Sequence, residues 1–246
     1  MSFVRLILVA FRVVMALGWT LLVHYFCIAI PGLITRRKRY LNSLRWWGIG
    51  LSVIMGIRVH RVNSPPSPMG DLIVSNHMGF LDIPVLLQFF PAVFVIKMEL
   101  GKVPFFGARL IAQGHVFVER GNRTSRANAR QGIETVLQDG DRIIVFPEGK
   151  ASPYAERPSW APASLQVAQR LGKQVQLCII DYLPNRELLK WDISKPALPQ
   201  LANLLGRRRT DVSIQFFSPE HVTDPIQSAQ NFKSLVEAQL IRNQPR

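Results

Sequence analysis

The fold is decided by the segment Leu72-Ile73-Val74-Ser75-Asn76-His77-Met78-Gly79-Phe80-Leu81-Asp82. Its first apolar residues are typical of a buried strand, and a polar interruption follows where the chain is expected to enter a helix. Five residues separate His77 from Asp82, a rotation of roughly 500° on a helix with about 3.6 residues per turn, so the two side chains do not share a helix face. They meet only across a turn, with His77 at the end of the strand and Asp82 in the first helical turn.

Such a pair has the residues that general-base catalysis needs. A carboxylate that holds one imidazole nitrogen fixes the tautomer and stabilises the imidazolium, while the other nitrogen takes a proton from an attacking hydroxyl. Taken alone, a histidine and an aspartate at this spacing more often form a structural hydrogen bond, or lie there by chance, than act in catalysis. The interpretation therefore depends on the rest of the chain.

Short apolar runs recur along the chain after residue 70, with helical patterns between several of them. The strand-like runs are Leu72–Val74, Val93–Ile96, Val116–Val118, Ile143–Phe146, Val175–Ile180 and Val212–Phe216. Thr124 or Ser125 is expected to cap a helix towards Leu137, and Thr223 or Asp224 is expected to cap the last helix. This alternation predicts an α/β fold.

The charge of the chain is unevenly distributed. The formal net charge is +14, but residues 1–70 hold nine Lys or Arg and no acidic residue, whereas residues 71–246 hold 21 basic and 16 acidic residues. The excess lies beside the most hydrophobic part of the chain, where basic residues meet anionic headgroups of a cytoplasmic leaflet. No charged patch with stacking aromatic residues is visible elsewhere, so the sequence predicts a membrane partner and no nucleic acid.

The N-terminal region has the features of a membrane anchor. Val13–Ile34 is a run of 22 residues without formal charge, close to the ~20 residues of a spanning helix. Residues 36–39 are Arg-Arg-Lys-Arg, which argues against a cleaved signal peptide and places the catalytic region in the cytoplasm. The shorter stretch Trp46–Ile57 is expected to lie in the membrane surface or to form a hairpin with the first, and burial of both stretches as core helices is the remaining alternative.

Prolines, serines and glycine between residues 63 and 70 indicate a linker. The predicted organisation is therefore membrane-associated helices over residues 1–62, a linker over 63–70 and a catalytic domain over 71–246.

Two further blocks follow the His77 segment in order. The second contains Lys97, Glu99, Pro104 and Gly107, followed by Gly114-His115-Val116-Phe117-Val118-Glu119-Arg120, and the third is Phe146-Pro147-Glu148-Gly149. Together with Asn76, His77 and Asp82, these blocks resemble the three motifs of the lysophosphatidate acyltransferase family, the 1-acylglycerol-3-phosphate acyltransferases. The resemblance implies the glycerolipid acyltransferase fold, a mixed sheet flanked by helices.

The resemblance also implies roles for individual residues. His77 is the base and Asp82 its orienting partner, in direct attack of a lysolipid hydroxyl on an acyl thioester. The residues expected to bind or border the substrate are Lys97, Gly114, Phe117, Arg120, Pro147, Glu148, Gly149 and Lys150. Arg120 corresponds to a phosphate or headgroup ligand, a role that suits a guanidinium.

Two blocks depart from the family pattern. The third motif usually continues Thr-Arg, but here it continues Lys150-Ala151, so an arginine expected to bind phosphate is missing. The fourth motif, normally a Val-Pro run, is represented by Val175–Ile180 without its prolines. These motifs therefore do not decide which lysolipid is the acceptor.

The sequence as a whole predicts an O-acyltransferase of phospholipid biosynthesis that acylates 1-acylglycerol-3-phosphate, using acyl-CoA or acyl carrier protein as co-substrate. Acylation of another lysolipid, such as lyso-ornithine lipid or a remodelling phospholipid, is the alternative within the same chemistry, and an inactive lipid-binding relative is the alternative outside it. We expect no cofactor and no metal, because Cys27 and Cys178 form no metal-ligating pattern with histidines. The expected partners are membrane lipids, a lysophospholipid acceptor and the acyl donor.

Overall fold

The computed structural model describes residues 3–29, 36–103, 106–119, 121–152, 157–182, 186 and 196–243. The helices are α1 (Phe3–Ala29), α2 (Arg36–Ile54), α3 (Asp82–Phe89), α4 (Met98–Gly101), α5 (Phe106–Ala112), α6 (Arg123–Gln138), α7 (Ala163–Arg170), α8 (Ala197–Leu205) and α9 (Pro225–Arg242). The strands are β1 (Ile57–Arg61), β2 (Leu72–Ser75), β3 (Val93–Lys97), β4 (Val116–Val118), β5 (Ile143–Val145), β6 (Gln174–Asp181), β7 (Thr210–Phe216) and β8 (Glu220–His221). Each of the six predicted apolar runs forms a strand.

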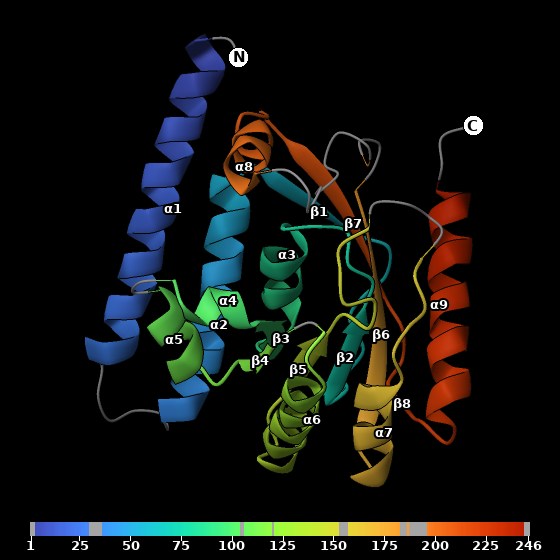
Figure 1. Cartoon of the computed structure of the whole chain (residues 1–246). Helices are drawn as coiled ribbons and strands as arrows, with labels where there is room; N and C mark the ends of the chain where they lie inside the picture. Colours follow the sequence, from blue (N-terminus) through green and yellow to red (C-terminus); the bar gives the residue numbers. More distant parts are fainter. Residues whose placement is uncertain are drawn as a thin grey trace.

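The strands form one mixed sheet, which confirms the predicted fold class. Its order is β1-β7-β6-β2-β5-β3-β4, with β8 beside β6. The strands β6, β2, β5, β3 and β4 run parallel, whereas β7 is antiparallel to β6. Figure 1 shows α1, α2 and α3 in succession on one side of this sheet and α6, α7 and α9 on the other. The parallel strands consequently end at a single edge between two layers of helices.

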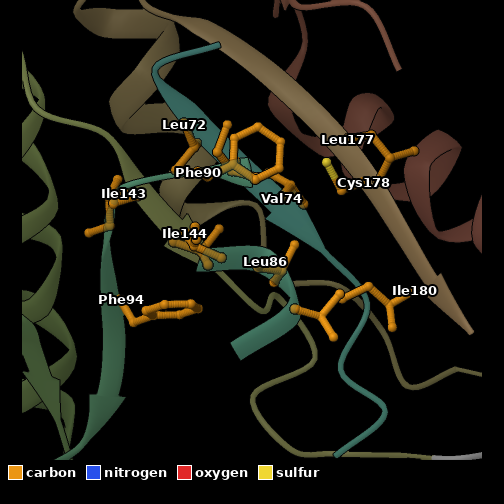
Figure 2. Packing of buried hydrophobic residues seen from close by; sticks show 14 of the residues in the cluster. Leu72, Val74, Leu86, Phe90, Phe94, Ile143, Ile144, Leu177, Cys178 and Ile180 are labelled. Carbon is orange, nitrogen blue, oxygen red and sulfur yellow. The ribbon is translucent and has the colours of Figure 1, made fainter. Parts of the chain in front are cut away.

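The hydrophobic core surrounds the central strands β2, β5 and β6. Leu72, Val74 and Ile144 are fully buried, and strands covered on both faces are expected to have continuous apolar runs rather than alternating ones. In Figure 2, Leu86 and Phe90 from the α3 region point into the same cluster as the side chains of β2. This packing fixes α3, and with it the helix start that carries Asp82, against the strand that precedes His77.

The first two helices form a hairpin that packs on the sheet and its helices. The indole nitrogen of Trp19 in α1 donates to the carbonyl oxygen of Trp47 in α2 over 3.3 Å, and the indole nitrogen of Trp47 donates to the hydroxyl of Thr20 over 3.0 Å. The helix α2 also packs against α3. Residues 30–35, where the predicted apolar run ends, lie outside the described residues.

The domain boundary predicted at residue 62 is wrong in one respect. Residues Ile57–Arg61 form β1, which pairs in parallel with β7, so the sheet begins inside the range assigned to membrane helices. The strand was missed because the prediction considered only continuous apolar runs, whereas charged residues alternate with apolar ones in β1.

The helix α1 combines an apolar surface with one buried cation. The segment Phe3–Val23 has the length and apolar composition needed to cross a membrane, and most of it is exposed. Arg12 is only 6% exposed, and its guanidinium donates to the carbonyl oxygens of Leu205 over 2.9 Å and of Arg208 over 3.1 Å, and also to that of Arg207. This contact holds α1 against the carboxyl end of α8, where unpaired carbonyls favour a cation.

Replacing Gly48 by alanine tests the packing of α2 on α3. A Cβ atom at Gly48 lies 2.8 Å from Cβ of Leu87 and 2.9 Å from the carbonyl oxygen of Pro84. Because the second neighbour is backbone, the helices must separate, and we expect a loss of about 1–3 kcal/mol and a lower thermal midpoint in detergent.

The matched control is Gly18→Ala in α1, where a Cβ atom meets no atom of the described residues within 4 Å. Alanine favours a helix over glycine by about 1 kcal/mol, so this variant is expected to keep or raise the midpoint. An unchanged midpoint for Gly48→Ala would contradict the described α2–α3 packing.

Candidate functional site

The predicted site residues converge because neighbouring parallel strands end at the same edge of the sheet. His77 lies in the turn after β2, and Glu148 lies in the turn after β5, which pairs with β2 in parallel. On the other side of β2, the parallel strand β6 ends at Asp181, immediately before Tyr182. Ligands of open α/β sheets are commonly bound at this carboxyl edge.

His77 and Asp82 meet across the turn, as the spacing predicts. Nδ1 of His77 lies 2.6 Å from Oδ2 of Asp82. The turn closes with the backbone N–H of Asp82 donating to the carbonyl oxygen of Gly79 over 3.3 Å, and α3 begins at Asp82. The carboxylate is fully buried, whereas the His77 side chain is 21% exposed.

Four donors surround the Asp82 carboxylate. Its Oδ2 accepts from Nδ1 of His77, from the backbone N–H of Met78 over 2.7 Å and from that of Gly79 over 3.0 Å, and its Oδ1 accepts from the hydroxyl of Tyr182. Burial and the neighbouring carboxylate raise the pKa of Tyr182 well above its ordinary value, so the phenol stays protonated and donates. Asp82 therefore has one fixed orientation towards the imidazole.

The imidazole of His77 is held on one face and open at one nitrogen. Its ring stacks on Phe146, with centroids 4.2 Å apart and planes inclined by 14°. Among the residues that the structure describes, Nε2 of His77 has no hydrogen-bond partner. An imidazole that is oriented through Nδ1 and open at Nε2 has the geometry of a general base.

Glu148 and Arg157 form a buried ion pair beneath His77. Nε of Arg157 donates to Oε1 of Glu148 over 2.8 Å, Nη2 donates to Oε2, and both side chains are fully buried. Burial raises the pKa of Glu148, while the charges of Arg157 and His77 act in the opposite direction. Removing one partner of such a pair leaves an uncompensated charge, at a cost of about 3–5 kcal/mol.

This ion pair holds the backbone at His77. Nη2 of Arg157 donates to the carbonyl oxygen of His77 over 2.8 Å, and the N–H of His77 points to Oε1 of Glu148 over 3.4 Å. Of the two roles considered for Glu148 from the sequence, substrate binding and ordering of the pocket, the geometry favours the second.

Asn76 joins the two strands that flank the site. Its side-chain amide donates to the carbonyl oxygen of Ile180 and its side-chain oxygen accepts from the N–H of Ile180, both over 2.8 Å. At this point β2 bends into the turn, and the Asn76 side chain takes the place of its backbone as partner of β6. It satisfies both the N–H and the carbonyl oxygen of the buried residue Ile180. The backbone directly before His77 is therefore held in place by two hydrogen bonds to β6.

Other predicted residues lie at the same edge. Lys97 ends β3 and is exposed, while Lys150 is exposed in the turn after β5. Gly149 has a φ of +68°, a conformation that L side chains rarely adopt, and Pro147 precedes it in the half-buried part of the turn. Of the predicted substrate-binding residues described at this edge, Lys97 and Lys150 are the exposed cations.

Two predicted residues have other surroundings. Gly114 lies at the amino end of β4, where a φ of +77° closes the turn after α5, so its position is that of a turn residue at the edge opposite His77. Phe117 is half-buried in the middle of β4 and packs close to Gly101. Arg120 lies outside the described residues.

Sequence reasoning missed Tyr182 and Arg157. Tyr182 is 100 positions from Asp82, but it directly follows a predicted strand, and the rule that parallel strands share one edge was a signal that pointed to it. Arg157 had no such signal, because it lies between the recognised motif and α7 in irregular structure.

Comparisons with known proteins agree with this architecture. Residues 56–181 match the Acyltransferase family. A lyso-ornithine lipid O-acyltransferase of Brucella abortus is 28% identical over 186 residues, which cover 69% of this chain and 70% of that protein. A 1-acyl-sn-glycerol-3-phosphate acyltransferase of Neisseria meningitidis is 27% identical over 135 residues, covering 55% of this chain and 52% of that protein.

The crystal structure of a 1-acyl-sn-glycerophosphate (LPA) acyltransferase from Thermotoga maritima has the same fold. The TM-score is 0.73 at 21% sequence identity, and the match covers 97% of this chain and 95% of that one. The coverage includes the N-terminal helices as well as the sheet.

The fold and the site together define an α/β protein with a histidine and a buried carboxylate at the carboxyl edge of its parallel strands. The chain belongs to the Acyltransferase family, and it is an O-acyltransferase of lipid metabolism. The family recognised from the sequence motifs is thereby confirmed.

Replacing Tyr182 by phenylalanine tests whether the phenol positions the His–Asp pair. The variant leaves Oδ1 of Asp82 buried without its donor, and a hydrogen bond to a charged group contributes about 1.5–3 kcal/mol. We expect kcat for acyl transfer to fall about tenfold or more, with little change in KM for either substrate.

The matched control is Thr210→Val, which removes a buried hydroxyl that has no hydrogen-bond partner among the residues that the structure describes. We expect this variant to keep the activity of the native protein. Equal kcat for Tyr182→Phe and Thr210→Val would contradict the positioning role.

Proposed function

We propose that the protein transfers a fatty acyl chain from an acyl thioester to the free hydroxyl of a lysophospholipid, with His77 as general base. The observation that carries the proposal is the 2.6 Å contact between Nδ1 of His77 and Asp82, which leaves Nε2 open. Family membership supports the reaction class, and the geometry supports these roles.

The proposed chemistry balances without a covalent acyl-enzyme. Nε2 of His77 takes the proton of the acceptor hydroxyl as the oxygen attacks the thioester carbonyl. A C–O bond forms, the C–S bond breaks, and the thiolate leaving group takes the proton from the imidazolium. Asp82 stabilises that imidazolium, and Tyr182 holds Asp82 in place. The products are a diacyl lipid and a free thiol, either coenzyme A or acyl carrier protein.

The first candidate acceptor is 1-acylglycerol-3-phosphate. Relatives with this activity in their names support it. The exposed side chains of Lys97 and Lys150 at the carboxyl edge supply cations for a phosphate, and Arg120 follows β4 by two residues. We assign these three residues to the headgroup side of the site.

We further propose that the α1–α2 hairpin is attached to the cytoplasmic face of a membrane. The basic residues 36–39 follow the first apolar helix, which is the arrangement of a cytoplasmic flank. Hydrogen bonds hold α1 against α2, through Trp19 and Trp47, and against Leu205, through Arg12. These contacts favour a helix that lies along the membrane surface rather than one that crosses the membrane by itself.

The proposed function is tested by acyl transfer from labelled thioesters to a panel of lysolipids. The panel holds 1-acylglycerol-3-phosphate, lyso-ornithine lipid and lysophosphatidylcholine, each with acyl-CoA and with acyl carrier protein as donor. We expect His77→Ala to lower the rate by about 10²–10⁴, the range of general-base catalysis. The control is His221→Ala, which changes an exposed histidine on β8.

The outcomes distinguish the proposals. Transfer by His77→Ala at the native rate would contradict the role of the base. If the native protein acylates no member of the panel with either donor, the function itself is contradicted and the lipid-binding alternative is favoured.

A second candidate acceptor is lyso-ornithine lipid. Two relatives named lyso-ornithine lipid O-acyltransferase align with 69% and 71% of this chain, compared with 55% for the Neisseria meningitidis relative. Lys150-Ala151 also replaces the Thr-Arg pair that the resemblance associates with phosphate binding. A headgroup without phosphate makes that arginine unnecessary.

Ala151→Arg tests the link between this position and the acceptor. A guanidinium at residue 151 adds charge-assisted hydrogen bonds to a phosphate, so we expect kcat/KM for 1-acylglycerol-3-phosphate to rise about tenfold relative to lyso-ornithine lipid. Ala161→Arg, at an exposed position, is the control for added charge. An unchanged ratio of kcat/KM would exclude residue 151 as the source of selectivity.

A further inference from the structure

A concave site lies between α1 and the turn that follows α8. The cavity has a volume of about 610 Å³, within the usual range for a small-molecule site. Its lining includes Val4, Arg5 and Leu8 of α1 and Arg207, Arg208 and Arg209 of the turn. We call it the α1–α8 pocket. Figure 1 shows α8 beside the amino-terminal part of α1, at the upper end of the molecule in this view.

The arginines of this pocket carry charge that the protein does not neutralise. Arg209 pairs with Asp211 at 2.5 Å. Within the described part of the chain, neither Arg5, Arg207 nor Arg208 forms an ion pair, and Nε of Arg207 is buried without a hydrogen-bond partner. A buried guanidinium donor without an acceptor is costly, so the pocket favours a ligand that supplies oxygen acceptors.

The negative end of α8 does not offset these cations. Carbonyl oxygens at the carboxyl end of a helix ordinarily attract a cation and repel an anion. Here the guanidinium of Arg12 already donates hydrogen bonds to the carbonyl oxygens of Leu205, Arg207 and Arg208. The guanidinium groups of the lining residues therefore remain available to an anion.

The apolar side of the pocket indicates the kind of anion. Val4 is 66% exposed at its rim, and the exposed hydrophobic side chains of α1 continue from there along the helix. A free phosphate has no apolar part that could pack against this surface. A phospholipid can place its phosphate among the arginines and its acyl chains along the apolar helix. Basic pockets beside membrane helices bind anionic headgroups in this way.

We propose that the α1–α8 pocket binds the phosphate of an anionic membrane phospholipid at a site separate from the acceptor site. The turn at residues 206–209 precedes β7, which lies two strands from β2 in the sheet, with β6 between them. A bound lipid thus contacts α1 and the turn after α8, and none of the residues that line the pocket belongs to the His77 site.

The test measures binding to the full-length protein in non-ionic detergent. The probes are dihexanoyl phosphatidylglycerol, dihexanoyl phosphatidylcholine and inorganic phosphate at matched ionic strength, and the readout is the rise of the thermal midpoint with concentration. For the native protein we expect an apparent Kd for phosphatidylglycerol at least tenfold lower than for either of the other probes. Acyl transfer is not needed for this readout, so failure of the proposed reaction leaves the test unaffected.

Two variants with the same change in charge are compared. Arg5→Gln/Arg207→Gln/Arg208→Gln removes the unpaired cations of the pocket, and Arg123→Gln/Arg126→Gln/Arg130→Gln removes three exposed cations from α6. We expect the apparent Kd for phosphatidylglycerol to rise at least tenfold in the pocket variant and less than twofold in the α6 variant. If the pocket variant does not fold, Arg208→Glu replaces it with Arg126→Glu as control, because both positions are exposed.

Three results would overturn the proposal. Equal weakening in both variants would show a general effect of charge. Equal affinity for phosphatidylglycerol and phosphatidylcholine would remove the role of the anionic headgroup. Binding of inorganic phosphate as tight as that of phosphatidylglycerol would identify the ligand as a free anion instead of a lipid.

Discussion

The buried carboxylate of Asp82 is the constraint on which the site depends. A charge without solvent requires several donors, and Asp82 obtains them from the turn after β2, from His77 and from Tyr182 at the end of β6. These donors belong to segments far apart in the sequence. The carboxylate can be accommodated only when β2, β6 and α3 are in their final places, so the orientation of the imidazole is a consequence of the packed sheet.

A second buried charge cluster lies on the other side of His77. The pair formed by Glu148 and Arg157 reaches the backbone of His77 from the turn after β5, and a carboxylate of α9 extends it, since the N–H of Arg157 donates to Glu237 over 2.7 Å. Buried ion pairs contribute little net stability compared with apolar packing, but they define geometry. Both strands beside β2 therefore take part in placing one histidine.

The sequence predicted the parts of the molecule that depend on local pattern. Central strands such as β2 and β5 are continuous apolar runs, and the turn between His77 and Asp82 is implied by the geometry of a helix. The start of α6 was misplaced by two residues or more, because Asn122 is the capping residue and its side chain accepts from the N–H of Ser125. In α9 the cap is Asp224, one of the two residues expected. The contacts of Tyr182, Arg157 and Arg12 depend on distant segments, which no local pattern specifies.

The Arg12 contact also bears on the order in which the molecule is assembled. The guanidinium is in a helix at the start of the chain, and its acceptor at Leu205 is 193 positions further on. During synthesis, α1 is therefore complete long before α8 exists, and in that interval an apolar segment carries an unpaired cation. A single arginine at the centre of a helix raises the cost of insertion into a bilayer by about 2.5–3.5 kcal/mol. Until the segment that receives it has been made, Arg12 thus adds a cost to insertion of the nascent helix into a lipid phase.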